Sequence, residues 1–305
     1  MEFGPKKFEI EYNADFSSTK KIDDLKIWVA KPKTSIYQKI EGFKISKKPK
    51  SFYKEKHANK IMYFDFKKIN NLNLKIKIKA ILTNSKFELT NKIITPQKGT
   101  KLFNENTKSE KFLEQTPRIK RLTNQIIRND ESVLEKIVSI TNFLKTNFKY
   151  VYPVKKRGVK NLNLKNLKGD CGEVGALFVT MCRILKIPTV NKAGYVIYYD
   201  ELGNIYEHGW TSIYLNNLGW LDIDPLAENI KKIKNKYIYE QKNYFFTLIS
   251  GFNIEIKPPI PKNHKIDYWK NLGLPITKNS VQIIQPLIFS SKNKLNFEEH
   301  VKLTK

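Results

Sequence analysis

Three kinds of side chain in the middle of the sequence could together carry out thiol chemistry. Cys171 stands in the run Gly-Asp-Cys-Gly-Glu, His208 follows, and Asp222 and Asp224 come last. A helix N-terminus favours a thiolate, but by only about 0.3–1 kcal/mol when exposed. A cysteine nucleophile therefore needs an imidazole partner, and a carboxylate can fix the tautomer of that imidazole. The set predicts acyl transfer through a thioester.

The expected local structure would place these groups near one another. Asp170 and Glu173 form a capping signature, so a helix should begin at Cys171 and end before Pro188. Strands are expected over 190–199 and 205–215, joined by a turn at 200–204. A second turn at 216–219 would return the chain as a strand over 220–224, which brings a carboxylate beside the histidine strand. Spacing alone does not choose between the two aspartates.

Each residue also has a plain structural interpretation. Cys171 could be a small apolar residue that opens a helix, and a lone strand histidine is usually structural or exposed. Cys182, on the apolar side of the same helix, is expected to be a buried structural residue. The two cysteines should lie roughly 16 Å apart along the helix, beyond the about 7 Å limit for a disulfide. We expect two free thiols, which agrees with a reducing compartment.

The flanking regions predict support for this stretch. Short strands are expected up to about residue 93, among them 8–12, 25–29 and the clearly alternating 72–80, and they indicate an all-β module. A polar, aperiodic linker follows. Helices are expected from Pro117 and from Ser132, the second with a capping box formed by Ser132 and Glu135. No metal ligand spacing and no glycine-rich phosphate loop occurs, so no metal and no cofactor is predicted.

The central residues resemble the transglutaminase-like superfamily of cysteine enzymes, and specifically prokaryotic transglutaminase-like domain proteins. The run 169–173 with Arg183, Ile187-Pro188 and Gly194-Tyr195 is similar to the Gly-x-Cys helix start, the "GIP" turn and the "GY" strand of that family. His208-Gly209-Trp210 is similar to its His-x-Trp motif, and Gly219-Trp220 to Asp224-Pro225 to its Gly-Trp…Asp-Pro motif. Weaker similarity extends to Trp28, Tyr37-Gln38, Asn59 and Tyr63-Phe64.

The resemblance implies Cys171 as nucleophile, His208 as general base and acid, and Asp224, rather than Asp222, as the orienting carboxylate. It also implies a papain-like α+β core with the cysteine helix packed on an antiparallel sheet. Three positions depart from the family pattern: Lys186 replaces a glycine, Gly209 an alanine, and Leu226 a threonine or serine.

The net charge suggests nucleic-acid binding as a second class of function, but the kinds of basic residue present do not favour it. The formal net charge is +27, yet only five of the 56 basic residues are arginine, the residue best suited to phosphate and base recognition. Lysines spread along the whole chain with many Asn and Ile residues indicate a codon bias instead of a nucleic-acid site. No apolar run approaches the roughly 20 residues needed to span a bilayer, and no signal-peptide core is found near Met1. We expect a cytoplasmic protein.

These observations predict an α+β protein with an all-β sandwich-like domain at 1–96, a linker at 97–115, a catalytic domain at 116–250 and a C-terminal extension at 251–305. The predicted function is thiol-dependent acyl transfer, either hydrolysis of an amide or peptide or protein transglutamination, with a protein or peptide substrate bearing a glutamine or peptide amide. The alternative is a catalytically inactive module of the same fold that serves in protein binding or structure.

Overall fold

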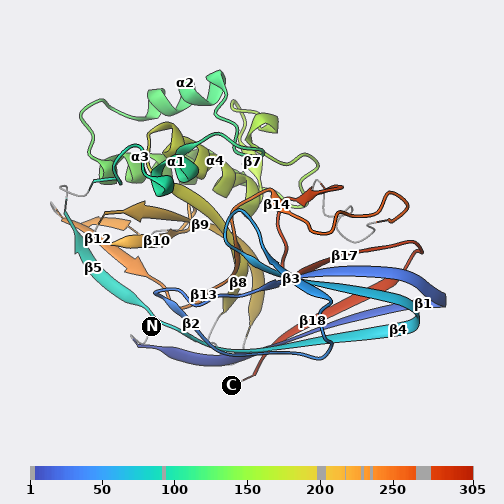
Figure 1. Cartoon of the computed structure of the whole chain (residues 1–305). Coiled ribbons are helices and arrows are strands. Elements are labelled where there is room, and N and C mark those ends of the chain that lie inside the picture. Colours follow the sequence, from blue (N-terminus) through green and yellow to red (C-terminus); the bar gives the residue numbers. More distant parts are fainter. Residues whose placement is uncertain are drawn as a thin grey trace. The chain divides into compact units, whose positions relative to one another are not determined.

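The structure is a computed structural model that describes residues 4–90, 94–197, 204–216, 218–227, 230–233, 236–265 and 276–304 (Figure 1). The turn expected at 200–204 lies outside these ranges except for Asn204. Contacts divide the chain into two compact units: residues 1–84, 193–208 and 242–305 form the first, and residues 85–192 and 209–241 the second. The expected domain ranges stay a prediction, because a contact unit need not fold by itself.

The first unit is built on two long antiparallel strands. β1 (Lys6–Lys31) pairs with β4 (Lys60–Leu82) along almost its whole length, with an irregularity in register between Ser17 and Ile22. The sheet has the order β17-β1-β4-β2, and β18 and β3 pair with β1 and β4. The other strands of this sheet are β2 (Gln38–Ile45), β3 (Ser51–Lys54), β17 (Leu287–Ser291) and β18 (Asn296–Thr304). Expected strands at 8–12 and 25–29 are thus two parts of one strand.

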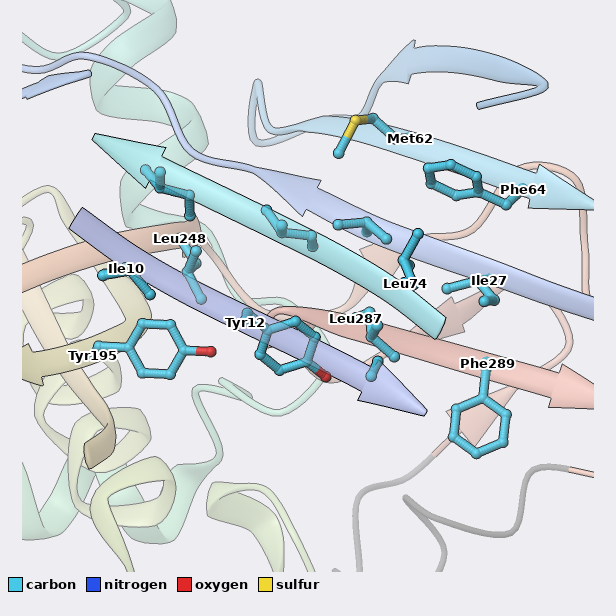
Figure 2. Packing of buried hydrophobic residues seen from close by; sticks show 14 of the residues in the cluster. Ile10, Tyr12, Ile27, Met62, Phe64, Leu74, Tyr195, Leu248, Leu287 and Phe289 are labelled. Carbon is cyan, nitrogen blue, oxygen red and sulfur yellow. The ribbon is translucent and has the colours of Figure 1, made fainter. Parts of the chain in front are cut away.

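The core of this unit follows from the two-residue period of its strands. Ile10, Tyr12 and Phe16 on β1 and Leu74 and Ile76 on β4 are buried, while charged residues alternate with them. β17 and β13 (Phe245–Ser250) add Leu287, Phe289 and Leu248 to the same cluster (Figure 2). Glu9 and Glu11 form ion pairs with lysines of β4 on the opposite face. The all-β character expected for the N-terminal region is confirmed.

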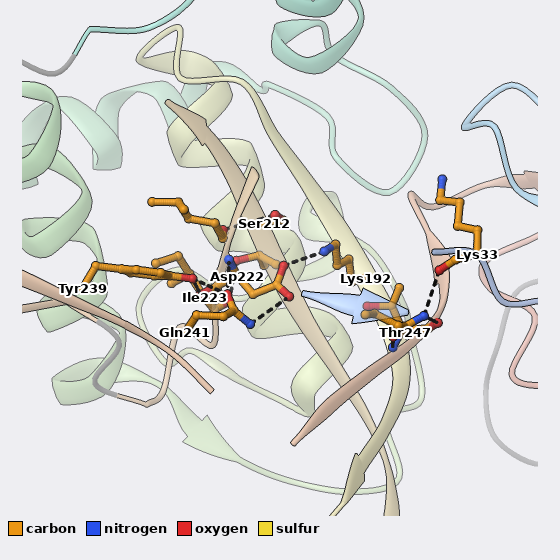
Figure 3. A network of polar contacts seen from close by, with 11 residues as sticks. Lys33, Lys192, Ser212, Asp222, Ile223, Tyr239, Gln241 and Thr247 are labelled. Atoms are coloured by element: carbon orange, nitrogen blue, oxygen red, sulfur yellow. Dashed lines mark hydrogen bonds and ion pairs between the residues drawn. The ribbon is translucent and has the colours of Figure 1, made fainter. Parts of the chain in front are cut away.

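Two buried amide side chains take the place of a strand along β13. Gln38 donates to the carbonyl oxygen of Thr247 over 2.9 Å and accepts from its N–H over 2.7 Å. Asn59 binds Ser250 in the same way, with distances of 2.7 Å and 3.0 Å. Gln38 also donates to the carbonyl oxygen of Lys33 (Figure 3). Because an unpaired buried backbone group is costly, these amides satisfy groups that no neighbouring strand reaches.

The second unit surrounds one buried helix, α4 (Cys171–Ile184). The helices α1 (Lys101–Thr107), α2 (Pro117–Ile126) and α3 (Val133–Asn147) all contact it, and Figure 1 shows them grouped together. The expected helices from Pro117 and Ser132 are confirmed, including the capping box of Ser132 and Glu135. Helix α1 lies inside the expected linker. Its only buried side chains are Phe103 and Thr107, which is too little periodicity to indicate a helix.

The remaining strands include those of a four-stranded sheet and several short strands. A four-stranded sheet has the order β10-β9-β8-β13, with β8 (Thr189–Ile197), β9 (Ile205–Leu215) and β10 (Gly219–Ile223). The hairpin expected between the histidine strand and the return strand is confirmed, since Ile223 pairs with Thr211 and Gly219 with Leu215. The short strands are β5 (Ser85–Leu89), β6 (Lys149–Tyr150), β7 (Lys168–Gly169), β11 (Ile230–Ile233), β12 (Lys236–Gln241), β14 (Ile254–Glu255), β15 (Ile276–Thr277) and β16 (Ser280–Val281).

The expected α+β class with an all-β region is therefore confirmed. Among the described residues, no helix is both long enough and apolar enough to span a bilayer.

The role of Gln38 gives a first prediction. Gln38→Ala should lower the free energy of unfolding by about 1–3 kcal/mol, because it leaves both backbone groups of Thr247 without their partner. Urea denaturation measures this loss. Lys39→Ala is the matched control: Lys39 is exposed and pairs only with Glu41 on the surface, so its loss should be about 0.5 kcal/mol or less. Equal stability of the two variants would contradict this role.

Candidate functional site

Cys171 is the first residue of helix α4, as the capping signature predicted. Asp170 is the N-cap, and its carboxylate accepts a hydrogen bond of 2.8 Å from the backbone N–H of Gly172. Cys171 itself is partly exposed, whereas residues 173–183 are all buried. The helix is thus anchored along its length, and its open end presents the thiol where unpaired N–H groups favour negative charge.

A buried arginine holds the start of this helix. Arg157 donates to both carboxylate oxygens of Asp170, over 2.6 Å each, and also to the carboxyl group of Glu173. The three residues are at most 8% exposed. Glu173 therefore does not reach back to the N-cap as a capping box would require; it faces the arginine instead. The backbone of Gly169 packs against it so closely that a Cβ there would lie 2.5 Å from the Cβ of Glu173.

This cluster contains two carboxyl groups, those of Asp170 and Glu173, and one cation, Arg157. The surroundings of Glu173 determine whether its carboxyl group is protonated. Burial and a hydrogen bond with Asp170 raise the pKa of Glu173 to about 8, although Arg157 opposes the shift. Glu173 is therefore protonated at neutral pH, and Arg157 and Asp170 form a neutral pair. As a result, Asp170 carries the one negative charge of this buried cluster.

The histidine strand reaches the thiol through Gly209. A Cβ built on Gly209 would lie 3.7 Å from the sulfur of Cys171, which is ordinary van der Waals contact. His208 is joined to Gly209 by a peptide bond, so the Cα atoms of the two residues lie about 3.8 Å apart. The imidazole ring of His208 stacks on Phe245, with ring centres 6.4 Å apart and an angle of 13°.

The two aspartates differ in their surroundings. Asp222 is buried and pairs with Lys192 over 2.6 Å, and its neighbour Gln241 lies within reach of the second carboxylate oxygen (Figure 3). Asp224 is only half-buried and follows the end of β10. One of its carboxylate oxygens accepts from the N–H of Leu226 over 3.0 Å, as in an Asx turn. Asp222 is thus committed to a structural ion pair.

Cys182 has the structural role expected of it. It is free and fully buried, and burial raises the pKa of its thiol to about 12. The two thiols of the chain therefore occupy opposite environments on one helix, and Cys182 offers an internal reference for the reactivity of Cys171.

The structure bears on all three departures from the family pattern. Lys186 adopts a left-handed backbone with φ of 62°, a conformation that costs a residue with a side chain roughly 1–2 kcal/mol and glycine very little. The backbone N–H of Leu226, rather than its side chain, binds Asp224, so a hydroxyl is not required there. The space at Gly209 would admit the methyl group of alanine.

Three residues close to this site were not singled out from the sequence: Arg157 and Lys192, which pair with Asp170 and Asp222, and Tyr150, which lies opposite Gly169 in the pairing of β6 with β7. Arg157 is one of only five arginines, and arginine suits buried ion pairs better than lysine does, so its identity was an available signal. Lys192 is one lysine among many and carries no such signal. Among the described residues, no group of three or more His, Cys, Asp or Glu side chains is arranged to hold a metal ion.

The raised pKa of Glu173 gives a prediction about stability and pH. An unfolded glutamate loses its proton near pH 4.5, whereas the folded chain keeps it up to about pH 8. Between these values the folded state binds more protons, so the free energy of unfolding should fall as pH rises, by up to about 1.4 kcal/mol per pH unit. Glu173→Gln cannot titrate and should remove this part of the slope. Urea unfolding from pH 5 to pH 8 measures it.

Glu135→Gln is the control for that experiment. The backbone N–H of Ser132 lowers the pKa of Glu135, so its contribution is complete above pH 4.5 and lost only below. That variant should keep the slope of the wild type between pH 5 and pH 8. If Glu173→Gln shows the same slope as well, Glu173 is already ionised at neutral pH.

Comparison with known proteins agrees with the geometry. Residues 120–225 match the model of the transglutaminase-like superfamily. A solved structure from Cytophaga hutchinsonii, assigned provisionally as a cysteine protease, aligns with a TM-score of 0.61 at 9% identity and covers 99% of this chain and 91% of that chain; at this identity the likeness shows the fold alone. None of the curated proteins compared with the chain matches it significantly.

A weaker likeness joins the chain to the periplasmic domain of TgpA from Pseudomonas aeruginosa, bound to ethylmercury. It has a TM-score of 0.37 at 14% identity and covers 72% of this chain and 90% of that domain. The family match includes Arg157, the helix start at Cys171, His208 and Asp224. Residues 120–225 therefore match a transglutaminase-like domain, within a chain of the α+β class.

Proposed function

We propose that the chain is a thiol-dependent acyl-transfer enzyme in which Cys171 forms a thioester with the carbonyl carbon of an amide. The family match supports a thiol-dependent enzyme at the level of the superfamily. The observation that carries the proposal is the closeness of the Cys171 sulfur to Gly209, the neighbour of His208 in the chain: a Cβ built on Gly209 would lie 3.7 Å from this sulfur. A partly exposed thiol at a helix N-terminus thereby meets the histidine strand.

In the proposed reaction, His208 takes the proton of the Cys171 thiol and the sulfur attacks the carbonyl carbon. The resulting oxyanion is stabilised by the backbone N–H of Cys171. Collapse of this intermediate breaks the carbon–nitrogen bond, and the imidazolium gives its proton to the departing amine. Water or a second amine then attacks the thioester, with His208 again acting as base. Hydrolysis and transamidation share every step up to this attack.

We assign the orienting carboxylate to Asp224. Asp222 is held in its ion pair with Lys192 and is buried, so a role in catalysis would require it to leave a charged partner. Asp224 follows the return strand and is partly exposed. A carboxylate in this role keeps one imidazole nitrogen protonated, which leaves the other free to accept the thiol proton.

The proposed substrate is a protein or peptide that presents a glutamine side chain or a peptide amide. The competing hypothesis is an inactive module of the same fold that binds protein. The two differ in the reactivity of Cys171, because an inactive module has no need for a histidine that activates the thiol.

Alkylation by iodoacetamide at pH 6.5 separates these hypotheses. We expect Cys171 to be labelled at least about 10-fold faster than free cysteine, because a neighbouring imidazolium favours the thiolate. Cys182 should remain unlabelled in the folded chain. His208→Gln should slow the labelling of Cys171 by about the same factor, whereas His300→Gln, a change at an exposed position on β18, should not. Peptide mapping by mass spectrometry gives the rate at each thiol.

Slow labelling of Cys171 that is unchanged in His208→Gln would favour the inactive module. Labelling of Cys182 at a similar rate would indicate that the chain was not folded in the assay, and the circular dichroism spectrum of the same sample checks this.

Substitution of Asp224 should lower activity, whereas substitution of Asp222 should lower stability. Asp224→Asn should reduce acyl transfer by roughly 10²–10⁴-fold with little change in stability, because it disturbs the imidazole tautomer. Asp222→Asn should instead lower stability, by up to about 3–5 kcal/mol, because it leaves the partly buried Lys192 without its counter-charge. Rates of p-nitrophenyl acetate turnover and urea unfolding curves for both variants test the assignment. The reverse pattern would transfer the catalytic role to Asp222.

A further inference from the structure

Gly209 leaves a space beside the Cys171 sulfur that is large enough for one methyl group. Among the described residues, the atoms nearest to a Cβ built on Gly209 would be this sulfur and the carbonyl oxygen of Lys192, both at 3.7 Å. These are ordinary van der Waals contacts, so alanine would fit at this position. Gly209 and Cys171 are both partly exposed, and a group from a bound molecule can therefore enter the space.

The space lies just outside the point at which helix α4 touches the sheet. Gly175 follows Cys171 by one helical turn, so the two residues face the same way. A Cβ on Gly175 would lie 3.1 Å from the side-chain nitrogen of Asn191 and 3.5 Å from Cγ2 of Thr211. Thr211 and Gly209 share a face of β9, because side chains alternate along a strand. The helix and the sheet are therefore in close contact at Gly175, and the gap between them is wider beside the thiol.

The backbone of β9 does not require a glycine at position 209. Gly209 has no positive φ, so a residue with a side chain can adopt its conformation. A glycine inside a strand lowers stability, and it often marks a place that a ligand approaches closely. Because the free thiol leaves the space unfilled, we expect a group to fill it only when the sulfur is bonded to substrate.

The two acyl donors considered for Cys171 differ at the carbon next to their carbonyl group. In a glutamine side chain this carbon is a CH2 group that carries one further carbon. In a peptide bond it is the Cα of a residue, which carries a nitrogen and, except in glycine, a side chain. The thioester of a peptide is thus branched directly beside the carbon that is bonded to the sulfur. The additional branch needs space close to the sulfur, whereas a glutamine donor does not.

We propose that Gly209 is a specificity-determining residue that admits this branch, so that the acyl donor of the chain is a peptide bond. When Cys171 attacks, the sulfur–carbon bond forms and the carbon–nitrogen bond breaks, and the amine leaves with the proton of the thiol. The acyl group stays on the sulfur with its branch beside Gly209, and water then releases it as a new carboxyl terminus. The inference rests on the proposed acyl transfer and names its substrate class.

Two p-nitrophenyl esters with equal numbers of carbon atoms test this role. The butyrate has a CH2 group beside its carbonyl group, as a glutamine side chain has, and the isobutyrate has a branched carbon, as a peptide has. Stopped-flow release of p-nitrophenolate, corrected for release by Cys171→Ala, gives the acylation rate constant for each ester. In the wild type the two constants should differ by less than about 10-fold, the smallest usual effect of a methylene that does not fit. In Gly209→Ala the ratio of the isobutyrate constant to the butyrate constant should fall by about 10–200-fold.

Gly42→Ala is the matched control. It adds the same methyl group to a glycine on β2 of the first unit, where the nearest atom would be the Cβ of Lys79 at 3.4 Å. This variant should keep the ratio of the wild type.

Three results would overturn the role of Gly209 and leave the proposed function intact. The first is a ratio in Gly209→Ala equal to that of the wild type. The second is loss of acylation by both esters in Gly209→Ala, which would show that the glycine serves the thiol itself. The third is a wild-type chain that disfavours isobutyrate by more than about 10-fold. A wild-type chain that forms no acyl-enzyme with either ester would overturn both proposals.

Discussion

The ion pair between Arg157 and Asp170 is the interaction on which the site depends. It fixes the N-cap of helix α4, and the cap in turn fixes the position of Cys171. Breaking a buried pair of this kind typically costs about 3–5 kcal/mol, far more than a helix N-terminus contributes to thiolate stability. The protonated Glu173 completes the cluster without adding charge. Because the cluster at the start of α4 has no net charge, it does not offset the positive end of the helix dipole near the thiol.

Buried charges are paired elsewhere in this chain as well, although its formal net charge is +27. Two of its five arginines, Arg157 and Arg183, are buried and pair with carboxylates around α4, whereas most of its lysines lie on the surface. Lys192 is an exception, since it neutralises the buried Asp222. Buried arginines therefore hold the helix and the partly buried Lys192 holds the return strand, while exposed lysines such as Lys77 form ion pairs that contribute little.

Much of this structure could be predicted from local sequence signals. The parts that could not be predicted depend on contacts between residues far apart in the sequence. The helix from Cys171, the capping box at Ser132 and the hairpin of β9 and β10 follow from periodicity and turn residues. Contacts between distant segments leave no such trace. Gln38 and Asn59 take the place of a strand along β13, and Tyr150 pairs with Gly169 in a two-residue ladder; both features depend on the tertiary fold. The roles of Cys171, His208 and Asp224, and the cytoplasmic location, stay predictions.

The central claim is that Cys171 carries the acyl group in a thioester. Intact-mass spectrometry of the chain, quenched in acid within seconds of mixing with p-nitrophenyl acetate, tests it most directly. We expect one added acetyl group, mapped to Cys171, released by hydroxylamine and absent from Cys171→Ala and His208→Gln. Acetylation confined to lysines, or a hydroxylamine-labile acetyl group that persists in Cys171→Ala, would contradict it.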